Sequence, residues 1–304
     1  MENELQDKVV EQPKKDYTLP ASILISAIIL AGAWVYTDKT LVSALEEKVL
    51  PPEGVVLPIR WGDLGAQLVN AGVIDSNKFK VIYEESGTFT PLESASLTGF
   101  TDEYENLLLG QNDGQLKITE DNAGYLLNLF WALGLANKNP ILDTGEMVNP
   151  EYGGAQNFAS TGGWTIAQGN AMDHYSRHKF FDLTDEQQAL VDKISRGIYR
   201  PCCNNSTHFP DCNHGMAMLG LLELMASQGV SEQDMWKAAL VVNSYWFPDT
   251  YITIASYMNN GRVDWKNVNP QEILGANYSS ASGYAKIASQ VPAQPRRGGN
   301  GCGI

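Results

Sequence analysis

Basic residues, cysteine and histidine are all scarce in this 304-residue chain. It has 21 lysines and arginines against 35 aspartates and glutamates, which gives a formal net charge of −14 at pH 7. So acidic a chain repels the phosphates of nucleic acids, and this argues against a nucleic-acid-binding role. Four cysteines are too few for a disulfide-stabilised scaffold of this length. Hydrophobic residues nevertheless make up 43% of the chain, enough for one or two domains with a hydrophobic core.

Several motifs of catalytic and cofactor sites are also missing. The sequence has no C-x-x-C-H haem attachment motif, no G-x-S-x-G nucleophile elbow and no H-E-x-x-H zinc motif. The glycines of residues 152–164 do not follow a phosphate-binding pattern, and Asp113 does not begin a calcium loop. The sequence therefore predicts no catalytic residue, and it leaves open whether the protein is an enzyme.

The N-terminal region contains an uncharged segment, residues 17–37, whose most apolar part is 21–36. As a helix this part is about 24 Å long, close to the thickness of a thin hydrocarbon core. Trp34 and Tyr36 fall where an interfacial aromatic belt is expected, and the preceding lysines favour a cytoplasmic N-terminus. We therefore predict a single-pass membrane anchor with the body of the protein outside the cytoplasm.

Two other interpretations of the same segment remain open. Ala31-Gly32-Ala33 resembles a signal-peptidase site after an apolar run, so the segment could be a cleaved signal peptide. It could also be a buried helix of a soluble domain. The first of these alternatives again places the body outside the cytoplasm.

The remaining chain is predicted to be all-α, because apolar residues recur at helical spacing and no convincing run of strands is found. Well-defined helices are expected at 120–138, after a capping box formed by Thr184 and Gln187, and at 213–228. A further helix at 168–179 would carry His174 and His178. The predicted organisation is a cytoplasmic N-terminus (1–20), an anchor (21–36), a juxtamembrane linker (37–54), a helical subdomain (55–147), a helical domain with a Cys/His loop (148–290) and a flexible Gly/Pro-rich tail (291–304).

The most informative segment is the loop that precedes the helix at 213–228. Three of the four cysteines and two of the four histidines fall between residues 202 and 214. Cys and His are the residues that bind zinc and copper(I), so we predict a metal site in this loop. The predicted ligands are Cys202, Cys203, Cys212 and His214, with His208, His174 and His178 as weaker candidates.

The same cysteines are compatible with two other roles. In an oxidising compartment, Cys212 could pair with Cys202 or Cys203 and leave the other cysteine available for thiol–disulfide exchange, with Cys302 in the tail as a resolving thiol. The pairing could instead be a structural disulfide in an envelope scaffold. An envelope protein is the predicted type of partner in either case.

Residues of the same region resemble a known family. Tyr199-Arg200, the adjacent cysteines, Asp211-Cys212-Asn213 and Gly229-Val230-Ser231 are similar to motifs of the three-helix, membrane-anchored thiol-oxidoreductase module of cytochrome c maturation. The similarity covers about residues 184–245. It implies extracytoplasmic thiol chemistry or haem ligation, although this chain has an adjacent cysteine pair in place of the family's C-x-x-C.

Overall fold

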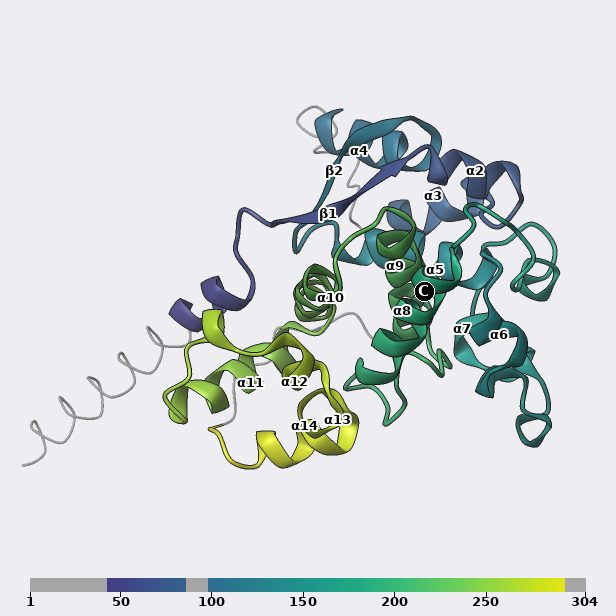
Figure 1. Ribbon diagram of the computed structural model, residues 1–304. Coiled ribbons are helices and arrows are strands. Elements are labelled where there is room, and N and C mark those ends of the chain that lie inside the picture. The colour runs from purple at the N-terminus through teal and green to yellow at the C-terminus, as the bar shows by residue number, and fades with distance from the viewer. Residues whose placement is uncertain (1–42, 86–97, 293–304) are drawn as a thin grey trace, which may run out of the picture. The chain divides into compact units, whose positions relative to one another are not determined.

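A computed structural model describes the backbone of residues 43–85 and 98–292, and the side chains of 43–83 and 103–292 (Figure 1). The predicted cytoplasmic segment 1–20, the anchor 21–36, the first part of the linker and Cys302 lie outside these residues. Among the residues described, none of the helices combines the length and the apolar character needed to cross a membrane.

The first half of the body combines short helices with a small sheet. Its elements are a helical segment at 43–49, β1 (Val55–Gly62), α2 (Leu64–Asn70), α3 (Ser76–Glu85), α4 (Thr98–Leu109), β2 (Asn112–Ile118) and α5 (Ala123–Ala136). β1 and β2 pair antiparallel, with Val55 opposite Ile118. The part of the protein that the structure describes is therefore mostly helical, in keeping with the all-α prediction, but it also contains this small sheet, for which the sequence shows no convincing run of strands.

β1 shows why the strands are hard to predict. Leu57, Ile59 and Trp61 alternate with more exposed residues, which is the period of a half-buried strand. However, Pro58 interrupts the pattern, and a proline usually argues against a strand interior. β2 begins with Asn112-Asp113-Gly114, residues that are typical of a turn and not of a strand.

The second half consists of helices joined by short turns. Its α-helices are α6 (Pro140–Thr144), α7 (Ala159–Gly162), α8 (Asp185–Gly197), α9 (Asn213–Ser227), α10 (Glu232–Trp246), α11 (Pro248–Asn260), α12 (Pro270–Leu274), α13 (Ala276–Ser279) and α14 (Ala281–Ala288). The predicted capping box at the start of α8 is confirmed, since Thr184 and Gln187 exchange side-chain-to-backbone hydrogen bonds. The helices predicted at 120–138 and 213–228 correspond to α5 and α9.

The helix predicted at 168–179 is not formed. Only Ala171–Asp173 make a 3-10 turn, which Asn170 and Asp173 cap reciprocally. Ser176 then adopts a positive φ of 52°, a conformation that a continuous helix does not allow. The backbone of this segment bonds instead to the end of α5, through Ser176 N to Leu135 O and His178 N to Ala136 O.

The core is built on the contact between α5 and α9, which lie side by side in Figure 1. A Cβ atom on Gly134 would lie 2.1 Å from the carbonyl oxygen of Met216, and one on Gly220 would lie 2.4 Å from that of Phe130. Only glycine at both positions allows the two backbones to approach this closely. Because α5 belongs to the predicted 55–147 subdomain and α9 to the 148–290 domain, the two share one core.

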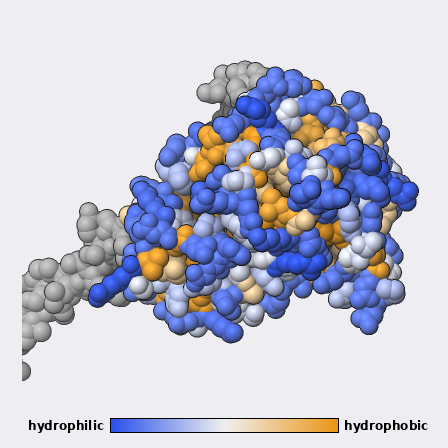
Figure 2. Space-filling view, viewed as in Figure 1, coloured by the Kyte–Doolittle hydropathy of each residue, from blue (hydrophilic) through white to orange (hydrophobic). Residues whose placement is uncertain are grey.

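The outer surface agrees with the acidic composition. On the face shown in Figure 2, hydrophilic residues predominate and hydrophobic residues form separate, smaller areas. Within the described part of the chain, the exposed large hydrophobic side chains are Val56, Val81, Leu109, Val148 and Tyr152. Single exposed residues of this kind are normal on protein surfaces.

One ionisable group lies inside this core. Glu223 of α9 is fully buried, and its carboxyl group accepts hydrogen bonds from the side-chain amides of Asn139 and, at 3.4 Å, Asn137. Burial raises the pKa of Glu223 well above its usual value, and the two amide donors only partly oppose this shift. The protonated form of Glu223 is therefore favoured in the folded state.

Replacing Glu223 with glutamine is expected to flatten the pH dependence of stability. Because the folded pKa is raised, the stability contributed by the protonated carboxyl is fully present below the unfolded value of about 4.3 and is lost as pH rises through the folded pKa. Glu223→Gln mimics the protonated form, so its free energy of unfolding should exceed that of the wild type increasingly as pH rises. Urea unfolding between pH 4 and 9 measures this difference.

The control is Glu151→Gln, a substitution at an exposed carboxylate. Parallel stability curves for wild type and Glu223→Gln across the whole pH range would contradict the expectation.

Candidate metal centre

The cysteine loop, residues 198–212, connects α8 to α9 and is fixed by backbone hydrogen bonds on both sides. Tyr199 pairs with Ser206 in an isolated bridge, and His208 N donates to Ser195 O of α8 at 3.1 Å. Ala281 N, at the start of α14, donates to Cys203 O at 2.8 Å. Although the loop has no regular secondary structure, its backbone is held in place by α8 and α14.

This loop brings the sulfur atoms of Cys202, Cys203 and Cys212 together. The three Sγ atoms lie within 4.8 Å of one another, and those of Cys202 and Cys212 are 3.7 Å apart. Cys202 is exposed, Cys203 is half-buried and Cys212 is buried, and none of them is in a disulfide. Two sulfurs bound tetrahedrally at about 2.3 Å from one zinc ion would be roughly 3.8 Å apart. The spacing of Cys202 and Cys212 therefore fits a shared metal ion.

A buried arginine, Arg200, lies beside the sulfur cluster. The side chain of Arg200 has no exposed surface, and its Nη2 donates to Asp211 Oδ1 at 2.8 Å, Phe209 O at 3.3 Å and Cys203 Sγ at 3.4 Å. Its Nε and Nη1 are buried without a hydrogen-bond partner. Unpaired donors on a buried cation are costly, so the positive charge needs nearby negative charge for compensation.

A glycine in the first turn of α9, Gly215, leaves room for the guanidinium of Arg200. A Cβ atom on Gly215 would lie 2.7 Å from Arg200 Cζ, 2.8 Å from Nη2 and 2.9 Å from Nη1. The guanidinium therefore packs directly on the backbone of α9, where any larger residue would displace it. Gly215 is required here for close approach.

The surroundings of Cys212 stabilise its thiolate. Cys212 is the N-cap of α9, where the helix dipole favours negative charge. Hydrogen bonds from Cys202 and Cys203 hold the pKa of Cys212 well below its usual value, and the positive charge of Arg200 adds to this effect. For Cys203, the contact with Cys202 lowers the pKa, but the contact with Cys212 and burial raise it more. Of these two cysteines, Cys212 is thus the one whose thiolate the surroundings favour.

The neighbouring carboxylate of Asp211 completes the charge balance. Burial and the negative charge of Cys212 raise its pKa, while Arg200 and the amide of Asn205 oppose the shift. Arg200 therefore interacts with two anions at once, the carboxylate and the thiolate. Sequence reasoning missed Arg200, Asp211 and Gly215 as parts of the site, although Arg200 and Asp211 belong to the motifs of the family resemblance.

None of the four histidines adds a ring nitrogen to the sulfur cluster, which among the residues described consists of the three cysteines, although His214 is near enough to Cys212 to help lower the pKa of that thiol. His214 Nδ1 lies 2.9 Å from Asn213 Oδ1, and its ring packs against Phe247 with ring centroids 4.3 Å apart. His208 Nε2 lies 2.8 Å from Asp192 Oδ1 at the edge of a cavity of about 400 Å³.

His174 and His178 form a pair of their own. His174 Nδ1 and His178 Nε2 are 3.0 Å apart, and His174 Nε2 lies 2.9 Å from Gln168 O. Burial and the neighbouring His174 lower the pKa of His178. The two rings do meet, as the predicted spacing suggested, but through an irregular turn and away from the cysteines.

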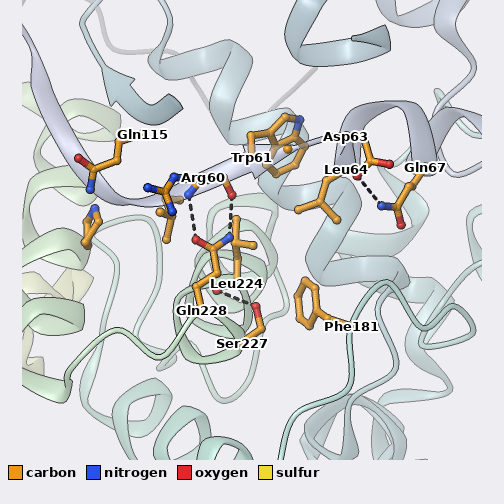
Figure 3. A pocket seen from close by; sticks show the side chains of 13 residues that line it. Arg60, Trp61, Asp63, Leu64, Gln67, Gln115, Phe181, Leu224, Ser227 and Gln228 are labelled. Carbon is orange, nitrogen blue, oxygen red and sulfur yellow. Dashed lines mark hydrogen bonds between the residues drawn. The ribbon is translucent and has the colours of Figure 1, made fainter. Parts of the chain in front are cut away.

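A second, larger cavity lies between β1 and the end of α9 (Figure 3). It has a volume of about 540 Å³ and is lined by none of the cysteines or histidines. The side-chain amide of Gln228 accepts from Arg60 N at 2.9 Å and donates to Arg60 O at 2.7 Å, so it pairs with the backbone of β1. This pairing connects β1 to the end of α9 and carries no reactive group.

Comparisons of the chain with protein-family models, with curated proteins and with solved structures find no match. The interpretation of the sulfur cluster therefore rests on its own geometry and chemistry.

Substituting Gly215 with alanine is expected to displace Arg200 and weaken the site. The new Cβ atom would overlap the guanidinium, and overpacking of this kind costs about 1–3 kcal/mol of unfolding free energy. Moving the positive charge away also raises the pKa of Cys212, so thiolate absorbance at 240 nm should appear at higher pH. Urea unfolding and a pH titration of this absorbance measure the two effects.

Gly114→Ala is the matched control, since a Cβ atom there would approach nothing closer than 3.6 Å. If Gly215→Ala behaves like this control in both measurements, Arg200 is not held as described.

Proposed function

We propose that the protein binds one soft or borderline metal ion, copper(I) or zinc, through Cys202, Cys203 and Cys212. The observation that carries this proposal is the convergence of three sulfur atoms within 4.8 Å at the N-terminus of a buried helix. Thiolates are the protein ligands that copper(I) and zinc prefer. Because the surroundings of Cys212 already favour its thiolate, less free energy is needed to deprotonate the three cysteines when a metal ion binds.

The charge around the cluster supports an anionic metal–thiolate complex. Three thiolates carry a charge of −3, so copper(I) leaves −2 and zinc leaves −1 on the complex. Arg200 and the positive end of α9 lie beside the sulfurs and offset this charge. The buried, incompletely paired guanidinium would thus be better compensated by a copper(I) complex of charge −2 than by a metal-free cluster with one thiolate, whereas a zinc complex of charge −1 would give no such gain.

The number of ligands favours copper(I). Zinc sites are almost always four-coordinate, whereas copper(I) accepts a set of three sulfurs. His214 was predicted as the fourth ligand, but its ring is held by Asn213 and Phe247. Zinc would need a ligand from solvent, from a substrate or from a residue outside those described.

We further propose that this site functions outside the cytoplasm. The proposal rests on the predicted anchor at 21–36, which places the body on the outer side of a membrane. An envelope protein that supplies or receives the ion would then be the expected partner.

Thiol–disulfide exchange is the second candidate function, and the distance of 3.7 Å between Cys202 and Cys212 Sγ favours it. Cys202 is exposed and the pKa of Cys212 is lowered by its surroundings, which are the properties of an exchanging pair. The resemblance to the thiol-oxidoreductase module of cytochrome c maturation implies the same chemistry. A non-enzymatic envelope scaffold with a structural Cys202–Cys212 disulfide is the third.

The metal-binding proposal predicts one copper(I) per chain in the fully reduced, full-length protein. Cys203→Ser and Cys212→Ser should each weaken binding at least about hundredfold, more than the loss of about 10–100-fold typical of residues that only support a ligand. Anaerobic titration against a competing copper(I) chelator measures the affinity, and elemental analysis measures the stoichiometry.

His214→Gln tests the coordination number in the same assay. Affinity within tenfold of the wild type supports the three-cysteine set, whereas a loss as large as that of Cys212→Ser supports the Cys3His set. Absence of bound copper(I) and zinc in the wild type would refute the proposal.

The thiol-exchange alternative predicts that mild oxidation joins Cys202 to Cys212. In glutathione buffers the first product should be this disulfide, with a reduction potential above about −300 mV, the range of exchange-competent pairs. Peptide mapping by mass spectrometry identifies the pair. First formation of a disulfide that includes Cys203 would argue against the alternative, because Cys203 is held by Arg200 Nη2.

A further inference from the structure

The three cysteines of the sulfur cluster differ in their exposure to solvent. Cys212 is buried at the start of α9, and Cys203 is half-buried with its sulfur 3.4 Å from Arg200 Nη2. The Cys203 backbone is also fixed by the hydrogen bond from Ala281 N. Cys202 is exposed, in the turn that follows Arg200. The cluster therefore combines two cysteines on its inner side with one exposed cysteine.

The cluster also lacks a fourth ligand among the side chains described. No described His, Cys, Asp or Glu adds a ligand atom to the three sulfurs. The nearest carboxylate, Asp211, already pairs with Arg200 through one oxygen and with Asn205 through the other. Since Cys203 and Cys212 occupy the inner side, a fourth coordination position opens beside Cys202, toward solvent.

From this arrangement we infer that the bound ion is cargo, passed by direct ligand exchange to a thiol-bearing acceptor that enters beside Cys202. The inference rests on the proposed metal-binding function. An ion with an open position and one exposed thiolate can accept an incoming sulfur before it loses an existing one. A closed structural site, in contrast, offers no such position.

The exchange step is balanced without any oxidant or reductant. An acceptor thiol loses its proton as its sulfur–copper bond forms, the Cys202–copper bond breaks, and the Cys202 sulfur takes up that proton. The second acceptor thiol then loses its proton as its sulfur–copper bond forms and the bonds to Cys203 and Cys212 break. Cys203 takes up that proton, Cys212 remains a thiolate, and copper remains in the +1 state throughout. The fitting partner is a protein that presents two neighbouring thiols on its surface.

The test loads the full-length protein with copper(I) and mixes it anaerobically with a synthetic peptide that carries a Cys-x-x-Cys pair. Stopped-flow measurement gives the transfer rate as a function of peptide concentration. Direct exchange predicts a rate that rises in proportion to the peptide, at least tenfold over a tenfold to twentyfold range. A rate independent of peptide concentration means that copper dissociates first, and it overturns the inference while leaving metal binding intact.

Cys302→Ser is the matched control, because it removes the chain's fourth cysteine. With an open fourth position, both the affinity and the transfer rate stay within twofold of the wild type. A tenfold or larger loss of affinity would make Cys302 a fourth ligand and overturn the open site. Failure of the wild type to bind copper(I) at all would instead remove the proposed function itself.

Discussion

The packing of the Arg200 guanidinium on Gly215 is the contact on which the candidate site depends. A buried cation is tolerated only where anions lie close to it, and here those anions are Asp211 and the cysteine sulfurs. The same contact joins the beginning of the loop, at Arg200, to its end at Asp211 and to the first turn of α9. Loop conformation, thiolate formation and helix start are therefore coupled, and a change to one of them alters the others.

The position of α9 is in turn fixed by its contact with α5. Because Gly134 and Gly220 let the two backbones touch, α9 cannot shift along α5 without a clash between main-chain atoms. Glu223 reinforces this register through Asn137 and Asn139, which follow the end of α5. The N-terminus of α9, and with it Cys212, is thus placed by the rigid centre of the body rather than by the loop.

Local sequence patterns were sufficient for part of this structure. The spacing of Cys202, Cys203 and Cys212 predicted their convergence, and the capping box at Thr184 predicted the start of α8. The rest depends on contacts between distant residues. His214 follows Cys212 by only two residues in the sequence. Its ring nevertheless contacts Asn213 and Phe247 and adds no nitrogen to the sulfur cluster. β1 needs β2 for its backbone hydrogen bonds, and the segment around His174 bonds to α5 instead of forming its own helix.

The proposed metal binding and disulfide exchange would use the same features of the site, but they differ in the charge that they would place beside Arg200. An exposed Cys202 near a stabilised Cys212 thiolate is reactive toward disulfides as well as toward metal ions. A bound metal ion would keep all three sulfurs as thiolates, and the positive charge of Arg200 would offset part of the negative charge of that complex. A disulfide neutralises Cys202 and Cys212 and leaves Arg200 with Asp211 and Cys203 alone. Because the unpartnered donors of Arg200 would be better compensated by the more anionic state, the buried arginine would favour metal binding over the disulfide.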